Sequence, residues 1–373
     1  MNKSLIALAV LAASGVASAQ STVTLYGIAD VWFGSLESPS TTGLKQTMIG
    51  SGGVDESRFG LKGSEDLGGG LKANFVLEQG FQIDTGAQSV SGTAEVKAAA
   101  AVPAGPGVVA KPAVLAAPAT PGQMFSRQAY VGFSGGFGQV RLGKTYTPFD
   151  DVSVTTNPGF NSALSPNNHV WLSTAYNGTS GYNANPANTV YYATPSLSGF
   201  SGAVSYSLGE NKTTAVSAGK VVSANVKYEG GPLYAGLAYQ IEKADGAATT
   251  AKFTRLNASY DFGVAKLLAG YGHVTDLVQV GLAAGNKTTE YQVGADFPVS
   301  PALTLSGGYA HSKSTNLGVG NADITRSGYG LAAAYSLSKR TFLYGGVQSS
   351  KQTQATVADV KGNLYGVGIH HAF

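Results

Sequence analysis

Apolar and polar residues alternate with a period of two along most of the chain. The segment 326–337, RSGYGLAAAYSL, places tyrosine, leucine and alanine on one face and mostly arginine, glycine and serine on the other. The segments 255–262, RLNASYDF, and 290–297, EYQVGADF, repeat the pattern. Because alternate residues of a β-strand point to opposite faces, these segments are predicted to be half-buried strands rather than helices.

Short turn signals and longer segments alternate between the strands. Seven short signals lie at 65–70, 134–138, 194–199, 229–232, 261–264, 298–301 and 337–340. Eight longer segments are centred near 35–55, 83–123, 146–187, 210–218, 243–251, 276–286, 314–324 and 351–360. Together they separate sixteen strands, and an even number places both chain ends on the side of the short turns. This predicts an all-β fold, a 16-stranded antiparallel transmembrane β-barrel with short periplasmic turns and long extracellular loops.

The composition agrees with a membrane protein built from strands. Charged residues make up 12% of the chain, which is about half the usual share, and its 51 glycines are about twice the average. The 19 tyrosines and 15 phenylalanines suit aromatic belts at the two membrane–water boundaries. A soluble β-sandwich is the alternative, but its turns would not sort by length so regularly.

The first nineteen residues have the pattern of a secretory signal peptide. Lys3 precedes an apolar run from Leu5 to Leu11, and small residues stand at Ala17 and Ala19. We predict cleavage after Ala19, which leaves residues 20–373 as the barrel domain. Loss of Lys3 lowers the net charge from +3 to +2, so nucleic acid is not an expected partner. The chain has no cysteine, which excludes disulfides and thiolate metal sites.

Several segments together resemble one protein family. They are TVTLYGIAD at 22–30, SRFGLKGSEDLGGGLKANFVLEQGF at 57–81, SRQAYVGFSGGFGQVRLGKTYTP at 126–148, LSKRTFLYGGV at 337–347 and the terminal HAF. Over essentially all of its mature length the chain resembles the general porins of the beta-proteobacterial outer membrane. The resemblance implies a homotrimer whose barrels form water-filled channels for the passive diffusion of small hydrophilic solutes and ions.

The resemblance also assigns roles to two parts of the chain. The last strand closes the barrel against the first, and its terminal Phe373 is the signal that the barrel-assembly machinery recognises. The second long segment, 83–123, would attach to the neighbouring subunit, although its Ala/Pro/Val-rich insertion is equally explained as a neutral expansion of an exposed loop. Outer-membrane lipid and lipopolysaccharide are the expected surroundings.

The third long segment, 146–187, is too long for a simple hairpin connection. It contains Asp150 and Asp151 but neither lysine nor arginine, and it is rich in asparagine, serine, threonine and aromatic residues. The family folds this segment into the lumen, where it would narrow the channel. A polar surface loop is the alternative.

Alternation also selects side chains that face the lumen. If Phe59, Leu61, Phe75, Leu77, Val140 and Leu142 face outward, the inward residues are Arg58, Lys62, Lys72, Asn74, Glu78 and Arg141, with Glu56 as a further candidate. The resemblance adds Arg127 and Lys144, although alternation groups both with outward residues. The predicted pore constriction is Arg58, Lys62, Lys72, Arg127, Arg141, Lys144, Asp150 and Asp151. Basic residues facing an acidic loop would set up a transverse field with a weak anion preference.

Two further sequence patterns do not indicate a function. Residues 138–145 match the phosphate-loop motif G-x-x-x-x-G-K-T, but they alternate as a strand and no helix follows, so the match is ascribed to chance. The five histidines lack metal or triad spacing, and His370 and His371 point to opposite faces. No catalytic residue, metal or cofactor is therefore predicted. A solute-specific channel with a binding track, or a barrel enzyme, remains the alternative to a general diffusion channel.

Overall fold

The computed structural model describes residues 22–37, 44–89, 123–174, 181–210, 212–214, 216–277, 284–317, 322–355 and 357–373. The predicted signal peptide, 1–19, and most of the second long segment, 90–122, lie outside the described residues.

The described residues form 17 strands and two short helices. In chain order they are β1 (Thr22–Glu37), β2 (Lys45–Ser51), β3 (Arg58–Gly68), β4 (Leu71–Gly80), β5 (Gln128–Gly135), β6 (Gly138–Lys144), α2 (Pro148–Ser153), α3 (Asn167–Val170), β7 (Thr189–Ala193), β8 (Phe200–Leu208), β9 (Lys220–Gly230), β10 (Leu233–Lys243), β11 (Ala251–Asp261), β12 (Lys266–Thr275), β13 (Lys287–Pro298), β14 (Leu303–Thr315), β15 (Ile324–Ser336), β16 (Thr341–Gln354) and β17 (Val357–Ala372).

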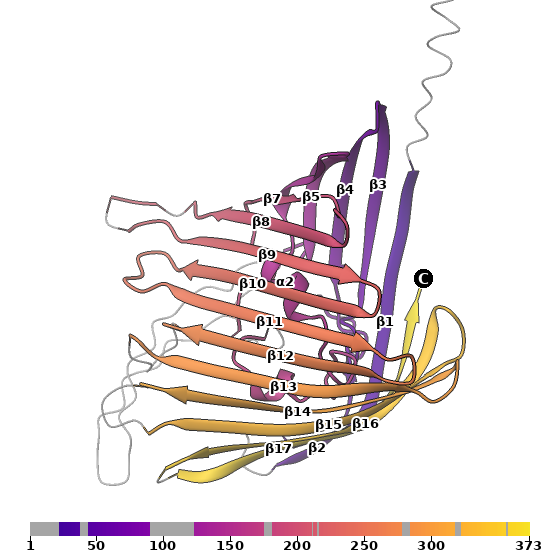
Figure 1. Cartoon of the computed structure of the whole chain (residues 1–373), viewed down its shortest axis with the longest axis vertical. Coiled ribbons are helices and arrows are strands. Elements are labelled where there is room, and N and C mark those ends of the chain that lie inside the picture. The colour runs from indigo at the N-terminus through magenta and orange to yellow at the C-terminus, as the bar shows by residue number, and fades with distance from the viewer. Residues whose placement is uncertain are drawn as a thin grey trace, which may run out of the picture.

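The 17 strands close into one antiparallel barrel with sixteen strand positions around its circumference, each of which we call a stave (Figure 1). Each strand from β3 to β16 pairs with the strand that follows it. The last strand, β17, pairs with β1 from Ile28↔Ala372 to Glu37↔Asn363. The strands β2 and β3 form one stave between them, because β2 pairs with the Val31–Glu37 half of β1 and β3 with the Thr22–Ile28 half. Closure leaves no unpaired sheet edge, which confirms the predicted fold.

The alternation gives the barrel an apolar exterior and a polar interior. In β11, Leu256 is 48% exposed on the outer face, whereas Arg255 and Asn257 beside it are 1% and 0% exposed. The predicted outward set of β15, including Tyr329 and Leu331, is exposed as well. A barrel that faces lipid has this arrangement, the reverse of a soluble globule.

All seven predicted turns connect neighbouring strands at one end of the barrel, and the described parts of the longer segments near 210–218, 243–251, 276–286 and 314–324 lie at the other end (Figure 1). The predicted loop near 351–360 is largely wrong, because β16 continues to Gln354 and β17 begins at Val357. The prediction of a long loop near 35–55 is largely wrong, because β1 continues to Glu37 and β2 already begins at Lys45. The irregular part is instead 52–57, where the stave is interrupted between β2 and β3.

The helix α2 begins the third long segment, inside the barrel. Thr147 caps it by accepting a hydrogen bond from the Asp150 N–H (3.3 Å), and Pro148 occupies the first turn. Asp150 and Asp151 follow in that same turn, where carboxylates suit the positive end of the helix dipole.

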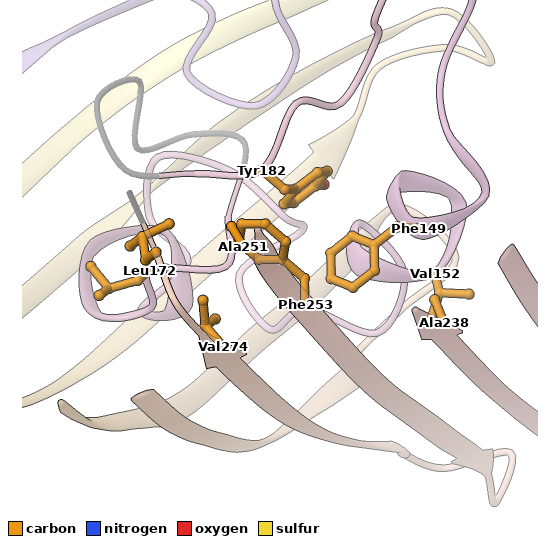
Figure 2. Close-up of a cluster of buried hydrophobic side chains, with 9 residues drawn as sticks. Phe149, Val152, Leu172, Tyr182, Ala238, Ala251, Phe253 and Val274 are labelled. Atoms are coloured by element: carbon orange, nitrogen blue, oxygen red, sulfur yellow. The ribbon is translucent and has the colours of Figure 1, made fainter. Parts of the chain in front are cut away.

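Apolar packing holds α2 against the inner wall (Figure 2). The ring of Phe149 lies 4.7 Å from that of Tyr182 and 6.0 Å from that of Phe253 in β11. Val152 packs in the same cluster beside Ala238 of β10. Because Phe149 and Val152 are fully buried there, they fix the start of the third segment to the β10–β11 side of the barrel.

The end of the chain is part of the closure. Phe373 and Gly27 exchange two backbone hydrogen bonds, each 3.0 Å long. The Phe373 ring lies directly over Gly27, where a Cβ would come within 2.3 Å of a ring atom. The position therefore requires glycine as long as the ring stays there.

Candidate functional site

The third segment, 146–187, follows the inner wall on one side of the barrel, and polar wall residues hold its backbone. The Asn225 amide of β9 donates to the Pro148 carbonyl (2.7 Å), and the Asn257 amide of β11 donates to the Val152 carbonyl (2.8 Å). Further along, the Ser312 hydroxyl of β14 donates to the Val170 carbonyl (2.8 Å). The backbone groups of the segment are thus satisfied by the wall, which keeps this polar chain ordered inside the barrel.

Two buried residues of opposite charge, joined through Ser173, hold the middle of the segment. The Glu290 carboxylate of β13 accepts hydrogen bonds from the Leu172 N–H, the Ser173 N–H (3.2 Å) and the Ser173 hydroxyl. Arg255 of β11 donates to the Ser173 hydroxyl (2.8 Å) and carbonyl, and its guanidinium lies 4.2 Å from the centre of the Trp171 ring. Arg255 and Glu290 are almost completely buried. The charge of each is therefore stabilised by the opposite charge of the other and by hydrogen bonds with Ser173 rather than by water.

A second segment, 52–57, turns into the lumen between β2 and β3. The buried carboxylate of Asp30 in β1 accepts hydrogen bonds from the N–H groups of Gly53 (2.9 Å), Val54 (3.2 Å) and Asp55 (3.0 Å). The Tyr344 hydroxyl of β16 donates to the same carboxylate (2.5 Å). One carboxylate therefore replaces the ladder partners that these backbone groups lose where the stave is interrupted.

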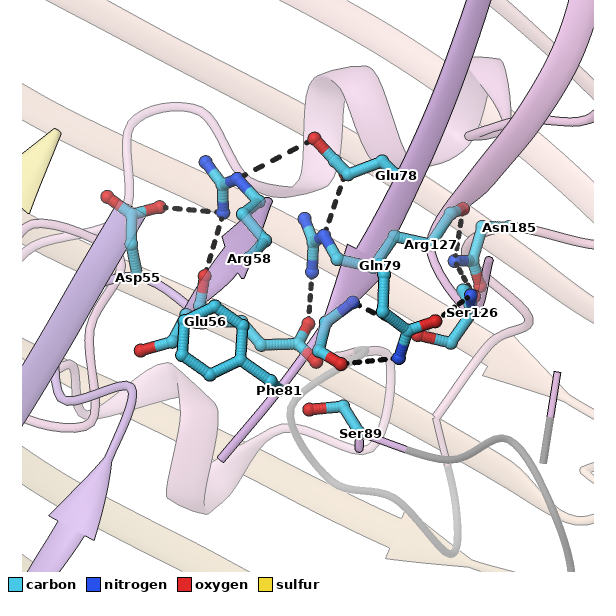
Figure 3. Close-up of polar contacts among 12 residues, drawn as sticks. Asp55, Glu56, Arg58, Glu78, Gln79, Phe81, Ser89, Ser126, Arg127 and Asn185 are labelled. Atoms are coloured by element: carbon cyan, nitrogen blue, oxygen red, sulfur yellow. Dashed lines mark hydrogen bonds and ion pairs between the residues drawn. The ribbon is translucent and has the colours of Figure 1, made fainter. Parts of the chain in front are cut away.

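The inward segment brings acidic residues next to the wall arginines (Figure 3). The Arg58 guanidinium lies 3.5 Å from Asp55 and 3.8 Å from Glu78, a residue of β4. The Arg127 guanidinium pairs with Glu56, and its Nε donates to Glu78 (2.8 Å). Each arginine thus has two carboxylate partners, and Glu78 is shared between them.

Both inward segments line a polar cavity of about 680 Å³, and they touch at one point, where the Ala163 N–H donates to the Gly53 carbonyl (2.8 Å). Its charged lining residues are Asp55, Glu56, Arg58, Arg127 and Asp150, and its remaining lining includes Tyr146, Asn157, Asn161, Asn168, Tyr182 and Asn185. We call the opening between the 52–57 segment and the 146–187 segment, lined by these residues, the aperture.

Three of the predicted constriction residues line the aperture: Arg58, Arg127 and Asp150. Arg127 does so although alternation groups it with outward residues, because β5 begins only at Gln128 and Arg127 belongs to the preceding loop.

Arg141 and Asp151 face the interior but do not line the aperture. The Arg141 guanidinium lies over the rings of Tyr130 and Tyr191, at 5.1 and 4.6 Å. The Tyr191 hydroxyl donates to Asp151 (3.2 Å), so both charged residues meet around this tyrosine.

Lys62 and Lys72 also face inward, but nearer the short-turn end. Lys62 lies 5.0 Å from the centre of the Tyr26 ring and lines a separate cavity of about 270 Å³. Lys72 is paired in register with Asp66, next to the turn that joins β3 and β4. Neither lysine lines the aperture, although both were predicted to lie at the constriction.

Lys144 is placed differently from the prediction. Its register partner is Ala129, which groups it with the outward residues of β5 and β6, and its ammonium donates to the Asn185 carbonyl (2.7 Å). Lys144 therefore tethers the end of the third segment instead of lining the aperture.

Sequence reasoning missed the inward turn of 52–57 and therefore Asp55. It also missed the anchors Asp30, Arg255 and Glu290. A run of small residues, GSGG at 50–53, was the available signal that the stave is interrupted there. No local pattern connects this run to Asp30, more than twenty residues earlier.

The electrostatic environments of the aperture carboxyls differ. Burial raises the pKa of Asp55, but the hydrogen bond with His370 and the charges of Arg58 and Arg127 outweigh it and leave the pKa below its ordinary value. Burial raises the pKa of Asp150 from 3.8 to about 7, against the opposing hydrogen bond from the Tyr182 hydroxyl. Asp55 thus stays ionised, whereas Asp150 titrates near neutrality.

A closed barrel with an apolar exterior, a polar interior and an inward loop defines the class of outer-membrane channel proteins. The family model described as Gram-negative porin matches residues 5–355. The outer membrane porin protein 32 of Delftia acidovorans is 35% identical over the full length of both chains. The chain therefore belongs to the Gram-negative porin family, and it is a β-barrel protein of the outer membrane.

Two solved structures show how far the fold is shared. The anion-selective porin from Comamonas acidovorans superposes with a TM-score of 0.72 at 28% identity, covering 95% of this chain and 100% of that one. OmpT of Vibrio cholerae, in its trimer form, superposes with a TM-score of 0.65 at 18% identity, covering 95% and 99%. At 18% identity, the similarity to OmpT shows a shared fold only.

The titration of Asp150 leads to an expected pH effect on ion permeation. As the pH falls from about 8 to about 6, Asp150 takes up a proton, and the ratio of cation to anion permeability is expected to fall by roughly twofold. Reversal potentials measured across this range provide the test, with Asp150→Asn expected to give a flat profile at the low-pH value. An equally steep profile in Asp150→Asn would contradict the assignment.

The same shift has a consequence for stability. Because the folded-state pKa of Asp150 lies above its ordinary value, the folded form binds the proton more tightly. Its contribution to folding is therefore fully present at low pH and is lost as the pH rises through about 7.

Proposed function

We propose that the chain forms a homotrimer in which each barrel passes small hydrophilic solutes and ions by passive diffusion with weak ion selectivity. The observation that carries this proposal is the polar cavity of about 680 Å³ between the two inward segments. Charged side chains, amides and hydroxyls line it, so water and ions can take the place of one another there without leaving polar groups unsatisfied. The homotrimer is what the resemblance to the general porins implies.

We assign Arg58, Arg127 and Asp150, together with Asp55 and Glu56, to the narrow part of this channel. Arg141, Asp151, Lys62 and Lys72 would line the wider interior. Residues 1–19 would direct export and be removed, leaving 20–373 as the barrel. Phe373 would serve as the assembly signal for the barrel-assembly machinery, and outer-membrane lipid and lipopolysaccharide would surround the apolar exterior.

A general diffusion channel is favoured over a solute-specific one by the position of the aromatic residues. Phe149 and Trp171 of the third segment are fully buried against the wall, where a passing solute cannot reach them. Of the described aromatic residues in that segment, Tyr146 and Tyr182 line the aperture, which is too few for a continuous binding track.

We propose no enzymatic activity. The relatives named above are porins. At the aperture both arginines pair with carboxylates, and Asp150 accepts a hydrogen bond from the Tyr182 hydroxyl. Among the described residues no cluster of histidine and carboxylate side chains suits a metal ion.

Conductance in a planar lipid bilayer tests the channel. The purified full-length mature protein is expected to insert with open steps that close in three equal levels, one for each subunit. Heat-denatured protein at the same concentration is the control and should give no steps. Folded protein without any conductance would refute the open channel, and single-level closures would refute the trimer.

Solute flux separates a general from a specific channel. In liposome swelling experiments, the flux of small sugars is expected to rise linearly with concentration and to fall with solute size. Saturation at low concentration for one sugar class would instead indicate a binding site and favour the solute-specific alternative.

A further inference from the structure

The aperture arginines are less accessible than the carboxylates that pair with them. The side chains of Arg58 and Arg127 are 20% and 15% exposed, whereas those of Asp55 and Glu56 are 41% and 40% exposed. Glu78, at 5%, lies behind both arginines and pairs with each. An ion in the cavity therefore meets carboxylate oxygens first.

The charge balance points in the same direction. Around the aperture of the described structure stand two guanidinium groups, Arg58 and Arg127. Against them stand the carboxylates of Asp55, Glu56 and Asp150, together with Glu78 behind the arginines. Even with Asp150 protonated, carboxylates outnumber guanidinium groups.

Three further interior cations, Lys62, Arg141 and Arg255, do not line the aperture, and the charge of Glu290 offsets that of Arg255. Lys62 lines a different cavity near the short-turn end, and Arg141 lies near Asp151 around Tyr191. Mobile ions screen such charges over about 10 Å at 0.1 M salt. The charges that line the aperture therefore dominate the potential that an ion experiences there.

We propose that this porin is selective for cations, and that the exposed carboxylate of Glu56, through its pair with Arg127, sets the preference. The inference rests on the proposed diffusion channel and adds its sign and its determining residue. It departs from the weak anion preference that the lumen-facing cations suggested from the sequence. It also gives this chain the opposite sign to the solved relative described as anion-selective.

The physical role of Glu56 is twofold. Its carboxylate contributes one negative charge to the cavity, and it offsets the Arg127 charge from the cavity side. Removing the charge therefore has a double effect, because a carboxylate is lost and Arg127 keeps only Glu78, which lies behind it, as a partner.

Reversal potentials under a potassium chloride gradient test the proposal on the full-length mature protein in planar bilayers. The wild type is expected to give a potassium-to-chloride permeability ratio above one. Glu56→Gln is expected to lower this ratio by about threefold, enough to bring it to one or below, and Asp55→Asn to lower it by about twofold. Both effects should shrink as the salt concentration rises toward 1 M, where screening shortens to about 3 Å.

A matched control is Glu65→Gln, which removes the same charge from the same stave but far from the aperture, next to the β3–β4 turn. It should keep the wild-type ratio. A conducting wild type with a ratio below one would overturn the proposal, as would conducting Glu56→Gln and Asp55→Asn channels that both keep the wild-type ratio. A folded wild type without any conductance would overturn the diffusion channel itself, so the two failures are distinguishable.

Discussion

Replacing Glu290 with alanine is expected to detach the third segment from the barrel wall and to lower the free energy of unfolding by about 3–5 kcal/mol. The substitution removes the acceptor for the Leu172 and Ser173 N–H groups and leaves the Arg255 guanidinium buried without its counter-charge. Trp171 adjoins this site and is one of only two tryptophans, so its fluorescence reports the change. We expect a red shift of the emission in native buffer and a lower urea midpoint.

The same variant should alter conduction, because a detached segment fluctuates across the aperture. Single-channel records are expected to show flickering closures that the wild type lacks. Glu290→Gln is the matched control, since its amide oxygen keeps an acceptor for the two N–H groups while losing the charge, and it should give an intermediate effect. Wild-type fluorescence and quiet, wild-type conductance in Glu290→Ala would show that the Glu290 carboxylate does not hold the segment.

Replacing Asp30 with alanine is the second change with a large expected effect. Three backbone N–H groups and the Tyr344 hydroxyl lose their common acceptor, and hydrogen bonds to a charged group contribute about 1.5–3 kcal/mol each. Because the 52–57 segment can move toward water and recover part of this, we expect a net loss of about 3 kcal/mol in the free energy of unfolding, measured in urea.

The released segment should also widen the aperture. With 52–57 displaced, Glu56 no longer holds Arg127, so a larger single-channel conductance is expected together with a shift of the reversal potential toward anions. Asp30→Asn keeps one acceptor oxygen and should be milder in both respects. If Asp30→Ala keeps the conductance and selectivity of the wild type, the carboxylate is not what positions the segment.

The barrel could be predicted from the sequence because its rules are local. Alternation in segments such as 255–262 assigns each side chain to a face, and the seven turn signals assign each strand its end. Both rules operate over a few residues, so neither depends on the rest of the chain.

The aperture could be predicted only in part, because its chemistry depends on contacts between distant segments. Alternation placed Arg58 in the lumen correctly, but a face does not reveal partners, and Asp55 and Glu78 offset its charge. The rule also stops where a strand stops, which is why Arg127 lines the aperture from a loop position.

The anchors of the third segment were beyond sequence reasoning for the same reason. In the sequence, Arg255 and Glu290 are two inward positions of ordinary strands. Their roles follow from the path of the third segment, more than eighty residues away along the chain for Arg255. No periodicity in either strand carries that information.

The seam between β1 and β17 has a consequence for the time course of folding. Gly27 and Phe373 pair although almost the whole chain separates them, so this contact has the largest loop-closure entropy of the barrel. Hairpins such as β9–β10 can form early because their partners are neighbours, whereas the seam gives the topology a high contact order. Until it closes, β1 and β17 remain open sheet edges, able to pair with another chain. The protein therefore spends the last stage of folding in the form that is most exposed to aggregation.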